Sequence, residues 1–279
     1  MNIGKYVERY SEDLRLKNYC DETIKNYCSQ VKLFLEHFNN DVTKPSEISE
    51  HQIKKWLLNS TSTALLKHKI SAIKLFYSIT GKQPLKFKNI PYPRKEQYLP
   101  DILSKEEVKQ LISVIKNTKH LSIIYLLYSG GFRIGEIINL KIKDIDSSRM
   151  VIIVRQGKGK KDRHVTLSQK VLDLLRVYLR EYFKDFNTEQ YLFKGQFKEQ
   201  YSVKSIQEFL NKYAKLAGIK KRVYPHLIRH SYSTHQLESG MDIGKLQILL
   251  GHSSPKTTQR YIHLSNCHIS GLQTPIDNL

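Results

Sequence analysis

The sequence has few cysteines, no long apolar run and few acidic residues for its length. Three cysteines occur in 279 residues, an odd number without CxxC spacing, and we interpret Cys20, Cys28 and Cys267 as reduced thiols of a cytosolic protein. No apolar run approaches the roughly 20 residues of a membrane-spanning helix. The first residues, MNIGKYVERYSED, carry charges where a signal peptide needs an apolar stretch. We therefore expect a protein that is neither exported nor inserted in a membrane.

The shortage of acidic residues leaves the chain strongly positive. Lys and Arg number 46 against 26 Asp and Glu, a formal net charge of +20. Residues 1–80 contain 12 basic and 9 acidic residues, residues 81–103 contain 5 and 2, and residues 104–279 contain 29 and 15. The alternatives are a solvated basic surface that only aids solubility and a surface for anionic membranes. An excess of this size favours a nucleic acid partner over both.

The chain also lacks the motifs of common nucleotide and metal sites. Its stretches SGGFRIGEI and GKGKK do not fit GxxxxGK[ST], which excludes an ATP-binding P-loop. Asp144 and Asp146 in KIKDID lack partners for a two-metal site, and we predict that they stabilise a turn. His226 and His230 have i, i+4 spacing but no HExxH glutamate, and Arg229 between them would repel a cation. We therefore predict neither a metal site nor a cofactor.

The first part of the chain is predicted to be helical. Apolar residues three or four positions apart predict helices around 3–14, 24–38, 53–57 and 63–80, and the simplest packing is a small four-helix domain. Four of the eight prolines then fall within 17 residues, in GKQPLKFKNIPYPRKEQYLPDIL, which predicts a linker. Its lysines fit a strap lying against a phosphate backbone and a plain spacer equally well.

The remainder of the chain combines helices with a short β-hairpin. Ser104 and Glu107 have the spacing of a capping box, and the apolar run HLSIIYLLYSGG predicts a helix ended by its two glycines. The β-prone runs MVIIVR and RHVTL flank QGKGKKD, a lysine-rich hairpin loop. Further helices are predicted around 168–183, 202–217, 226–239 and 242–264, the last broken near Gly251. The predicted fold is mainly α with a small antiparallel β-sheet.

Six residues of this second part have the chemistry that cleavage of a phosphodiester without metal requires. Two guanidiniums offset the charge of the non-bridging oxygens, a lysine protonates the leaving oxygen, one histidine accepts or relays a proton, another binds the phosphate, and a tyrosine attacks. In so basic a chain, a single Arg or Lys is more simply explained as a surface residue, and a single Tyr as a core residue. The hypothesis therefore rests on the joint pattern. The candidates are Arg133, Lys158, His226, Arg229, His252 and Tyr261.

In these residues the chain resembles the tyrosine recombinase (phage integrase) family, and in size its compact Xer-type members and the small integrases of mobile elements. The family's motifs correspond here to SGGFRIGE, GKGKKDR, HLIRHSYSTH and LLGH, with Tyr261 nine residues after His252. The departures are Ile228 for Leu, Ser233 for Ala and SGG for TG, and none removes a reactive group.

The resemblance implies a two-domain, C-shaped clamp around duplex DNA. Residues 1–82 would form a helical core-binding (SAM-like) domain, 83–103 a basic linker, and 104–279 the catalytic domain, with a C-terminal tail at 265–279 that protomers could exchange. Tyr261 would form a 3′-phosphotyrosyl link to DNA, without metal or ATP, and Glu136 would support Arg133. The further DNA contacts would be Arg94, Lys95, Lys160, Lys161 and Arg163.

The family also implies particular partners and a location. The protein would act on paired recombination sites as a homo-tetramer on DNA, would be monomeric or weakly associated when free, and would reside in the cytoplasm at the nucleoid. A topoisomerase-like (type IB) relaxing enzyme and a non-catalytic DNA-binding protein are the alternatives. The biological role would be chromosome-dimer resolution or the integration or excision of a mobile element.

Overall fold

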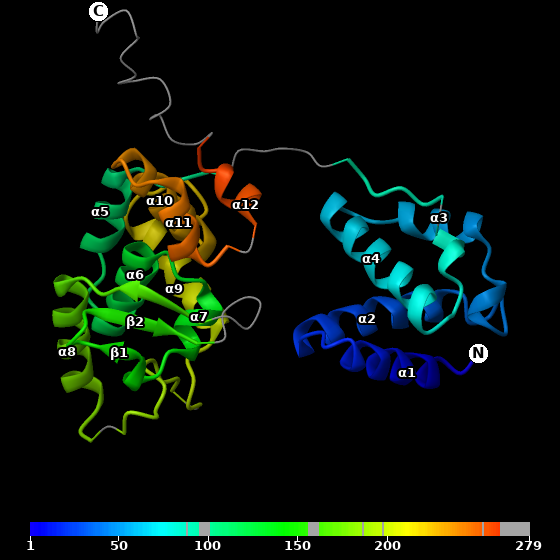
Figure 1. Cartoon of the computed structure of the whole chain (residues 1–279), viewed down its shortest axis with the longest axis horizontal. Helices are drawn as coiled ribbons and strands as arrows, with labels where there is room; N and C mark the ends of the chain where they lie inside the picture. Colours follow the sequence, from blue (N-terminus) through cyan, green and yellow to red (C-terminus); the bar gives the residue numbers. More distant parts are fainter. Residues whose placement is uncertain are drawn as a thin grey trace, which may run out of the picture. The chain divides into compact units, whose positions relative to one another are not determined.

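The chain forms two compact units, Met1–Gln97 and Tyr98–Leu279. The computed structural model describes residues 1–87, 89–94, 101–155, 162–185, 187–196, 198–252 and 254–262 (Figure 1). Within these residues no helix is both long enough and apolar enough to cross a membrane.

The first unit is helical, as the periodicity predicts. Its helices are α1 (Ile3–Leu16), α2 (Asp21–His37), α3 (Glu50–Leu58) and α4 (Thr63–Ile79), with a 3₁₀ turn at Pro45–Glu47. Aromatic side chains fill the core: the Phe34 ring meets those of Trp56 and Tyr77 edge-on, at centroid distances of 5.2 and 6.2 Å. The buried Tyr77 hydroxyl donates to the Pro45 carbonyl at 2.7 Å, so the ring also anchors the loop before α3.

Part of the proline-rich stretch packs against this first core. Residues Pro84–Phe87 form a 3₁₀ turn, and the side chains of Phe87 and Ile90 are buried with the helices. A linker was expected from residue 83 onward. Phe87 and Ile90 lie within that expected stretch, and their apolar side chains pack in the core of the first unit.

The second unit is mainly helical and contains a small sheet (Figure 1). A three-stranded antiparallel sheet has the order β1-β2-β3, with Ile152 opposite Ile145 and Val165. The predicted fold class is therefore confirmed. The elements are α5 (Lys105–Ser113), α6 (Thr118–Gly130), α7 (Ile134–Asn139), a 3₁₀ turn (Ile142–Asp144), β1 (Ile145–Asp146), β2 (Val151–Val154), β3 (Arg163–Thr166), α8 (Gln169–Tyr182), α9 (Val203–Leu216), α10 (Pro225–Glu238), α11 (Ile243–Leu250) and α12 (Pro255–Gln259).

The apolar helix α6 organises the second unit. It packs against α8 and α10, and an apolar surface on more than one side suits a helix with neighbours on more than one side. Gly131 ends it in the left-handed region, with φ of 56°. A Cβ at Gly131 would lie 2.5 Å from the Tyr232 ring, so this position requires glycine both for its backbone and for the close approach of α10. The chain then enters α7 directly, and Arg133 is the N-cap residue of this helix.

The acidic residues of KIKDID stabilise turns, as predicted. Asp144 accepts the Lys141 amide at 2.9 Å and pairs with Arg155 at 2.7 Å. Asp146 accepts the amides of Ser148 and Arg149. The two-residue strand β1 within this stretch was not predicted, since two residues are too few to show an alternating pattern.

Candidate active site

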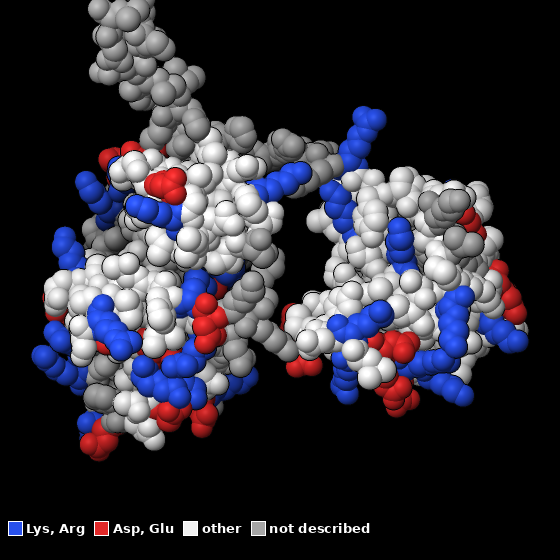
Figure 2. All heavy atoms as spheres, viewed as in Figure 1, with Lys and Arg blue, Asp and Glu red and all other residues white. Residues whose placement is uncertain are grey.

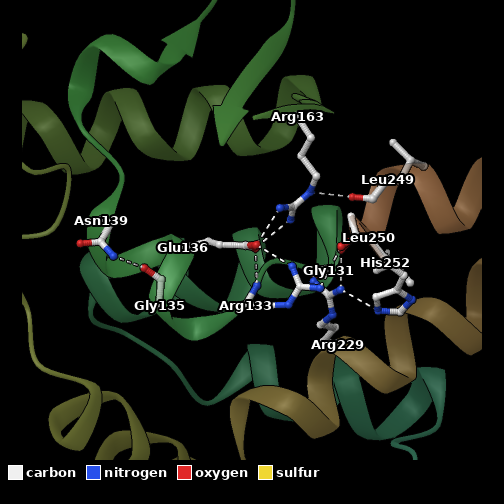
Figure 3. A network of polar contacts seen from close by, with 11 residues as sticks. Gly131, Arg133, Gly135, Glu136, Asn139, Arg163, Arg229, Leu249, Leu250 and His252 are labelled. Atoms are coloured by element: carbon white, nitrogen blue, oxygen red, sulfur yellow. Dashed lines mark hydrogen bonds and ion pairs between the residues drawn. The ribbon is translucent and has the colours of Figure 1, made fainter. Parts of the chain in front are cut away.

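The C-terminal end of α11 gathers three arginines from distant parts of the sequence (Figure 3). Arg163 Nε donates to the Leu249 carbonyl at 2.9 Å, Arg229 Nη2 to the Leu250 carbonyl at 2.7 Å, and Arg133 Nη2 to the Gly251 carbonyl at 3.2 Å. The last carbonyls of a helix have no partner within it and carry the negative end of its dipole. Three consecutive carbonyls therefore hold three guanidiniums side by side.

Glu136 compensates part of this positive charge. Its carboxylate accepts both Nη atoms of Arg163, at 2.6 and 2.7 Å, and Arg133 Nη1 at 2.8 Å. Burial alone would raise the pKa of Glu136, but the hydrogen bonds and charge of Arg163, and then those of Arg133, bring it below its ordinary value. The carboxylate is therefore ionised at neutral pH, and it fixes the orientation of both arginines.

Arg229 lies deepest in the cluster. It is 2% exposed, and its guanidinium also donates to the Gly131 carbonyl, just past the end of α6. Burial, and next the charge of Arg133, lower the pKa of Arg229 to about 10. The side chain stays charged at neutral pH, and its position at two helix C-termini offsets the cost of burial.

His252 connects Arg229 to the helix that precedes Tyr261. Its Nε2 lies 3.1 Å from Arg229 Nη2, and its Nδ1 lies 2.9 Å from Thr258 Oγ1 in α12. Burial, followed by the charges of Arg229 and Arg133, lowers the pKa of His252 to about 3, so the ring is neutral at neutral pH. Because Arg229 can only donate, Nε2 is the acceptor, and the ring proton lies on Nδ1, facing Thr258.

Tyr261 follows α12 and is 1% exposed. Its ring packs with the buried side chains of Tyr232, Leu246 and Leu250 and stacks on His252 at a centroid distance of 6.3 Å. Its hydroxyl lies 2.9 Å from His230 Nδ1 in α10. The ring of Tyr261 thus packs in a buried apolar cluster, whereas the residue also lines a polar pocket.

The pocket has a volume of ≈ 160 Å³. Among the described residues its walls contain three arginines, three histidines and no carboxylate, which makes it a site for an anion. With about 30 Å³ for each water molecule, the space suits several waters or a phosphate group. The lining residues are Arg133, His226, Arg229, His230, Gly251, His252, Thr257, Arg260 and Tyr261.

Five of the six residues predicted from the sequence line this pocket, and the sixth cannot be placed. Lys158 lies outside the described residues, as do the predicted DNA contacts Lys95, Lys160 and Lys161. The five that meet are Arg133, His226, Arg229, His252 and Tyr261, and Glu136 pairs with Arg133 Nη1 at 2.8 Å.

The structure gives the last two predicted DNA contacts different environments. Arg94 is exposed. The Arg163 side chain is 9% exposed, and all three of its side-chain nitrogens bind Glu136 or the Leu249 carbonyl. Arg163 thus lies beside the catalytic candidates, where it holds Glu136, and its contact with DNA stays a prediction.

Two residues of the site were missed from the sequence. His230, whose Nδ1 lies 2.9 Å from the Tyr261 hydroxyl, was not among the six candidates. Thr258, the partner of His252, was not singled out. The i, i+3 and i+4 spacing of His226, Arg229 and His230 does indicate one helix face, which is the signal that the sequence contained.

Comparisons with known proteins show the family of this chain. Residues 101–268 match the model of the phage integrase family, and residues 6–86 match that of the phage integrase N-terminal SAM-like domain. A tyrosine recombinase XerA of Thermococcus onnurineus is 34% identical over 275 residues, covering 97% of this chain and 95% of the relative. A tyrosine recombinase of Pseudothermotoga lettingae is 32% identical over 277 residues, covering 94% of each.

Solved structures are similar as well. The crystal structure of a XerA recombinase is 32% identical, with a TM-score of 0.56 and coverage of 95% of both chains. A XerH site-specific recombinase bound to its palindromic difH substrate is 24% identical, with a TM-score of 0.72 over 87% of this chain and 76% of that one, and is a likeness of fold alone.

Proposed function

Because the chain belongs to the phage integrase family and is a tyrosine recombinase, we propose that the pocket beside α11 is its catalytic centre and Tyr261 its nucleophile. The substrate is double-stranded DNA with paired recombination sites. The observation that carries the proposal is the placement of the Tyr261 hydroxyl in a pocket that also contains Arg133, Arg229 and His252.

The reaction exchanges one phosphoester for another. The Tyr261 oxygen bonds to the scissile phosphorus, the bond from phosphorus to the 5′ oxygen breaks, and that oxygen leaves as a hydroxyl with a proton from Lys158. The product is a 3′-phosphotyrosyl link. A 5′ hydroxyl from the partner strand then attacks the same phosphorus, and the steps run in reverse. No net bond energy is lost, so the strands are rejoined without ATP.

The arginines supply the charge that this transition state needs. A guanidinium has five N–H groups, and the described contacts of Arg229 use three, to Gly131, Leu250 and His252. The described contacts of the Arg133 guanidinium use two, so both retain donors for the non-bridging oxygens. Because the guanidiniums are already held by helix carbonyls, little reorganisation is needed when negative charge develops.

The proposal includes an assembly and a location. Two duplexes and four protomers form the recombining complex, and the protein acts in the cytoplasm on the nucleoid. The tail at 265–279, which protomers were expected to exchange, lies outside the described residues. Lys and Arg side chains project from the surface of each unit in Figure 2, which supports phosphate contacts by each of them. The role is either chromosome-dimer resolution or the movement of a mobile element.

The test begins with a search for the DNA site. Tyr261→Phe protein, which we expect to bind without cutting, selects duplexes from a library made from the DNA that flanks the gene. The selected duplex is then nicked near the scissile position, so that cleavage releases a short strand and traps the covalent complex. We expect the native protein to form this adduct, Tyr261→Phe to form none, and Tyr128→Phe to match the native protein. Binding without an adduct would refute the proposal.

The same duplex separates recombination from relaxation. A plasmid with two copies of the selected site should yield deletion or inversion products with the native protein. Relaxation of plasmids that lack the site, without such products, would favour the topoisomerase-like alternative instead.

A further inference from the structure

Helix α10 holds two histidines in hydrogen bonds to tyrosine hydroxyls, and one of the two tyrosines is the proposed nucleophile. His230 Nδ1 lies 2.9 Å from the Tyr261 hydroxyl, and His235 Nδ1 lies 2.7 Å from the Tyr128 hydroxyl. We propose that His230 is a catalytic residue, whose Nδ1 orients the Tyr261 phenol and takes its proton as the oxygen attacks phosphorus. The inference rests on the proposed function, since it assigns a role at that site.

The geometry favours His230 over the other histidines of the pocket. His252 has both ring nitrogens engaged, by Arg229 and by Thr258. His226 lies one turn before His230, with a ring-centroid distance of 6.4 Å between the two, and in the described structure no hydrogen bond joins it to Tyr261. His230 is thus the histidine in hydrogen-bonding contact with the attacking oxygen.

The protonation state of His230 suits an acceptor. Burial, and then the charges of Arg260, His226 and Arg229, lower the pKa of His230 to about 4. The ring is therefore neutral at neutral pH, and in the tautomer with its proton on Nε2, the Nδ1 lone pair faces the Tyr261 hydroxyl.

Binding of the substrate makes His230 a better base. The groups that face it are His226 and Arg229 on its own helix, Arg260 and Tyr261 after α12, and Arg133 and His252 across the pocket. A scissile phosphate among these groups adds a negative charge that offsets the arginines. The imidazolium then costs less free energy than in the free protein, and the pKa of His230 rises towards neutrality.

The proton balance of the step is simple. As the O–P bond forms, the phenolic proton moves to His230 Nδ1, which becomes an imidazolium. In the reverse reaction the imidazolium returns this proton to the departing Tyr261 oxygen. Lys158 handles the proton of the 5′ oxygen separately, so the two ends of the displacement have different proton partners.

The experiment compares matched variants of the two histidine–tyrosine pairs. Adduct formation is measured in single turnover, at saturating protein, with native protein, His230→Leu, His230→Asn and His235→Asn. We expect His230→Leu to be slower by on the order of a hundredfold, the low end for loss of a general base, with DNA affinity unchanged. His230→Asn should recover part of the rate, because its amide oxygen accepts a hydrogen bond, and His235→Asn should match the native protein.

A second substrate distinguishes the two ends of the reaction. When sulfur replaces the bridging 5′ oxygen, the leaving group departs without a proton. The hundredfold deficit of His230→Leu should persist on this substrate if His230 serves the nucleophile. Full recovery of the rate would overturn the inference, as would a His230→Leu rate within about threefold of native on the oxygen substrate.

The pH profile keeps the inference testable if the leucine variant does not fold. The native rate should fall at low pH as His230 becomes protonated in the DNA complex, and His230→Asn should lack this fall. The same fall in both proteins would overturn the inference. All of these comparisons require that the native protein forms the adduct. If the native protein binds DNA and forms no adduct, the proposed function fails instead, so the two failures are distinguishable.

Discussion

The two halves of α10 contain the same pair of groups in different surroundings. In the first half, His230 meets Tyr261 beside Arg133 and Arg229; in the second, His235 meets Tyr128 against α6. Burial is the main cause that lowers the pKa of both histidines, and His235 is itself 7% exposed. The pair of side chains alone therefore does not distinguish the proposed catalytic centre. The first pair differs in the open pocket and the excess of positive charge around it.

The largest expected effect follows from removal of the Glu136 carboxylate, which holds Arg133 and Arg163 beside the first pair. Glu136→Gln leaves the arginine side chains of Arg133 and Arg163, 19% and 9% exposed, without their counter-charge. We expect a loss of about 3–5 kcal/mol in the free energy of unfolding, measured with urea. The matched control is Glu189→Gln, since Glu189 pairs with Lys141 and Lys143 at the surface with its side chain 55% exposed. Its loss should stay within about 1 kcal/mol. Equal losses would contradict the structural role of Glu136.

The same carboxylate predicts a dependence on pH. The pKa of Glu136 is lower in the folded protein than its unfolded value of about 4.3, so its contribution is complete above that value and is lost as pH falls through the folded pKa. The difference in unfolding free energy between native and Glu136→Gln protein should stay constant from about pH 6 to 8 and shrink below about pH 4. If this difference did not change down to pH 3, that would contradict a pKa of Glu136 that folding lowers below its unfolded value.

A conservative change at Arg229 tests whether charge alone is enough. Arg229→Lys keeps a positive group, but one ammonium cannot reach the Gly131 and Leu250 carbonyls and the phosphate in the same planar arrangement. We expect adduct formation to slow by about a hundredfold, equivalent to about 2.7 kcal/mol. A lysine variant with the native rate would mean that the hydrogen bonds of Arg229 to the Gly131 and Leu250 carbonyls do not contribute to the rate.

Alanine substitutions at two glycines distinguish the cost of backbone strain from a change in the geometry of the site. Gly251 and Gly240 have φ of 60° and 85°, so an alanine at either should cost about 1–2 kcal/mol in unfolding free energy. A Cβ at Gly251 would lie 3.1 Å from Arg163 Cδ, whereas one at Gly240 meets nothing within 4 Å. We therefore expect Gly251→Ala to slow adduct formation by about tenfold as well, and Gly240→Ala to leave the rate unchanged. Equal rates in the two variants would argue against the placement of Arg163.

The smallest expected effect lies in the second half of α10. Tyr128→Phe removes the hydroxyl that binds His235 and should cost about 1 kcal/mol in unfolding free energy, with the native rate of adduct formation. A large loss of adduct formation in this variant would remove the distinction between the two pairs.

Local patterns in the sequence predicted much of the fold. The repeats of apolar residues indicated α1, α2 and α4, the capping box at Ser104 is formed with bonds of 2.7 and 3.1 Å, and Gly131 ends α6. These features depend on residues within a few positions of one another. Five of the six candidates, which their chemistry and then the resemblance had indicated, line one pocket.

What was missed depends on contacts between distant positions. The bond between Arg163 and Glu136, 27 positions earlier, was not predicted, because Arg163 lies next to a lysine-rich loop and has no local pattern that indicates Glu136. His230 and Tyr261 are 31 positions apart, and only the packing of α12 on α11 and of α11 on α10 brings them together. Spacing along one helix could show that His226 and His230 share a face; it could not show which of them reaches Tyr261.

The most direct test of the account is to identify the residue that carries the DNA. Adduct formed by the native protein on the selected duplex is digested with protease and nuclease, and the modified peptide is sequenced by mass spectrometry. We expect a peptide that contains Tyr261, with the nucleotide attached through its 3′ phosphate. Attachment at any other residue, or through a 5′ phosphate, would contradict the assignment of this pocket as the catalytic centre.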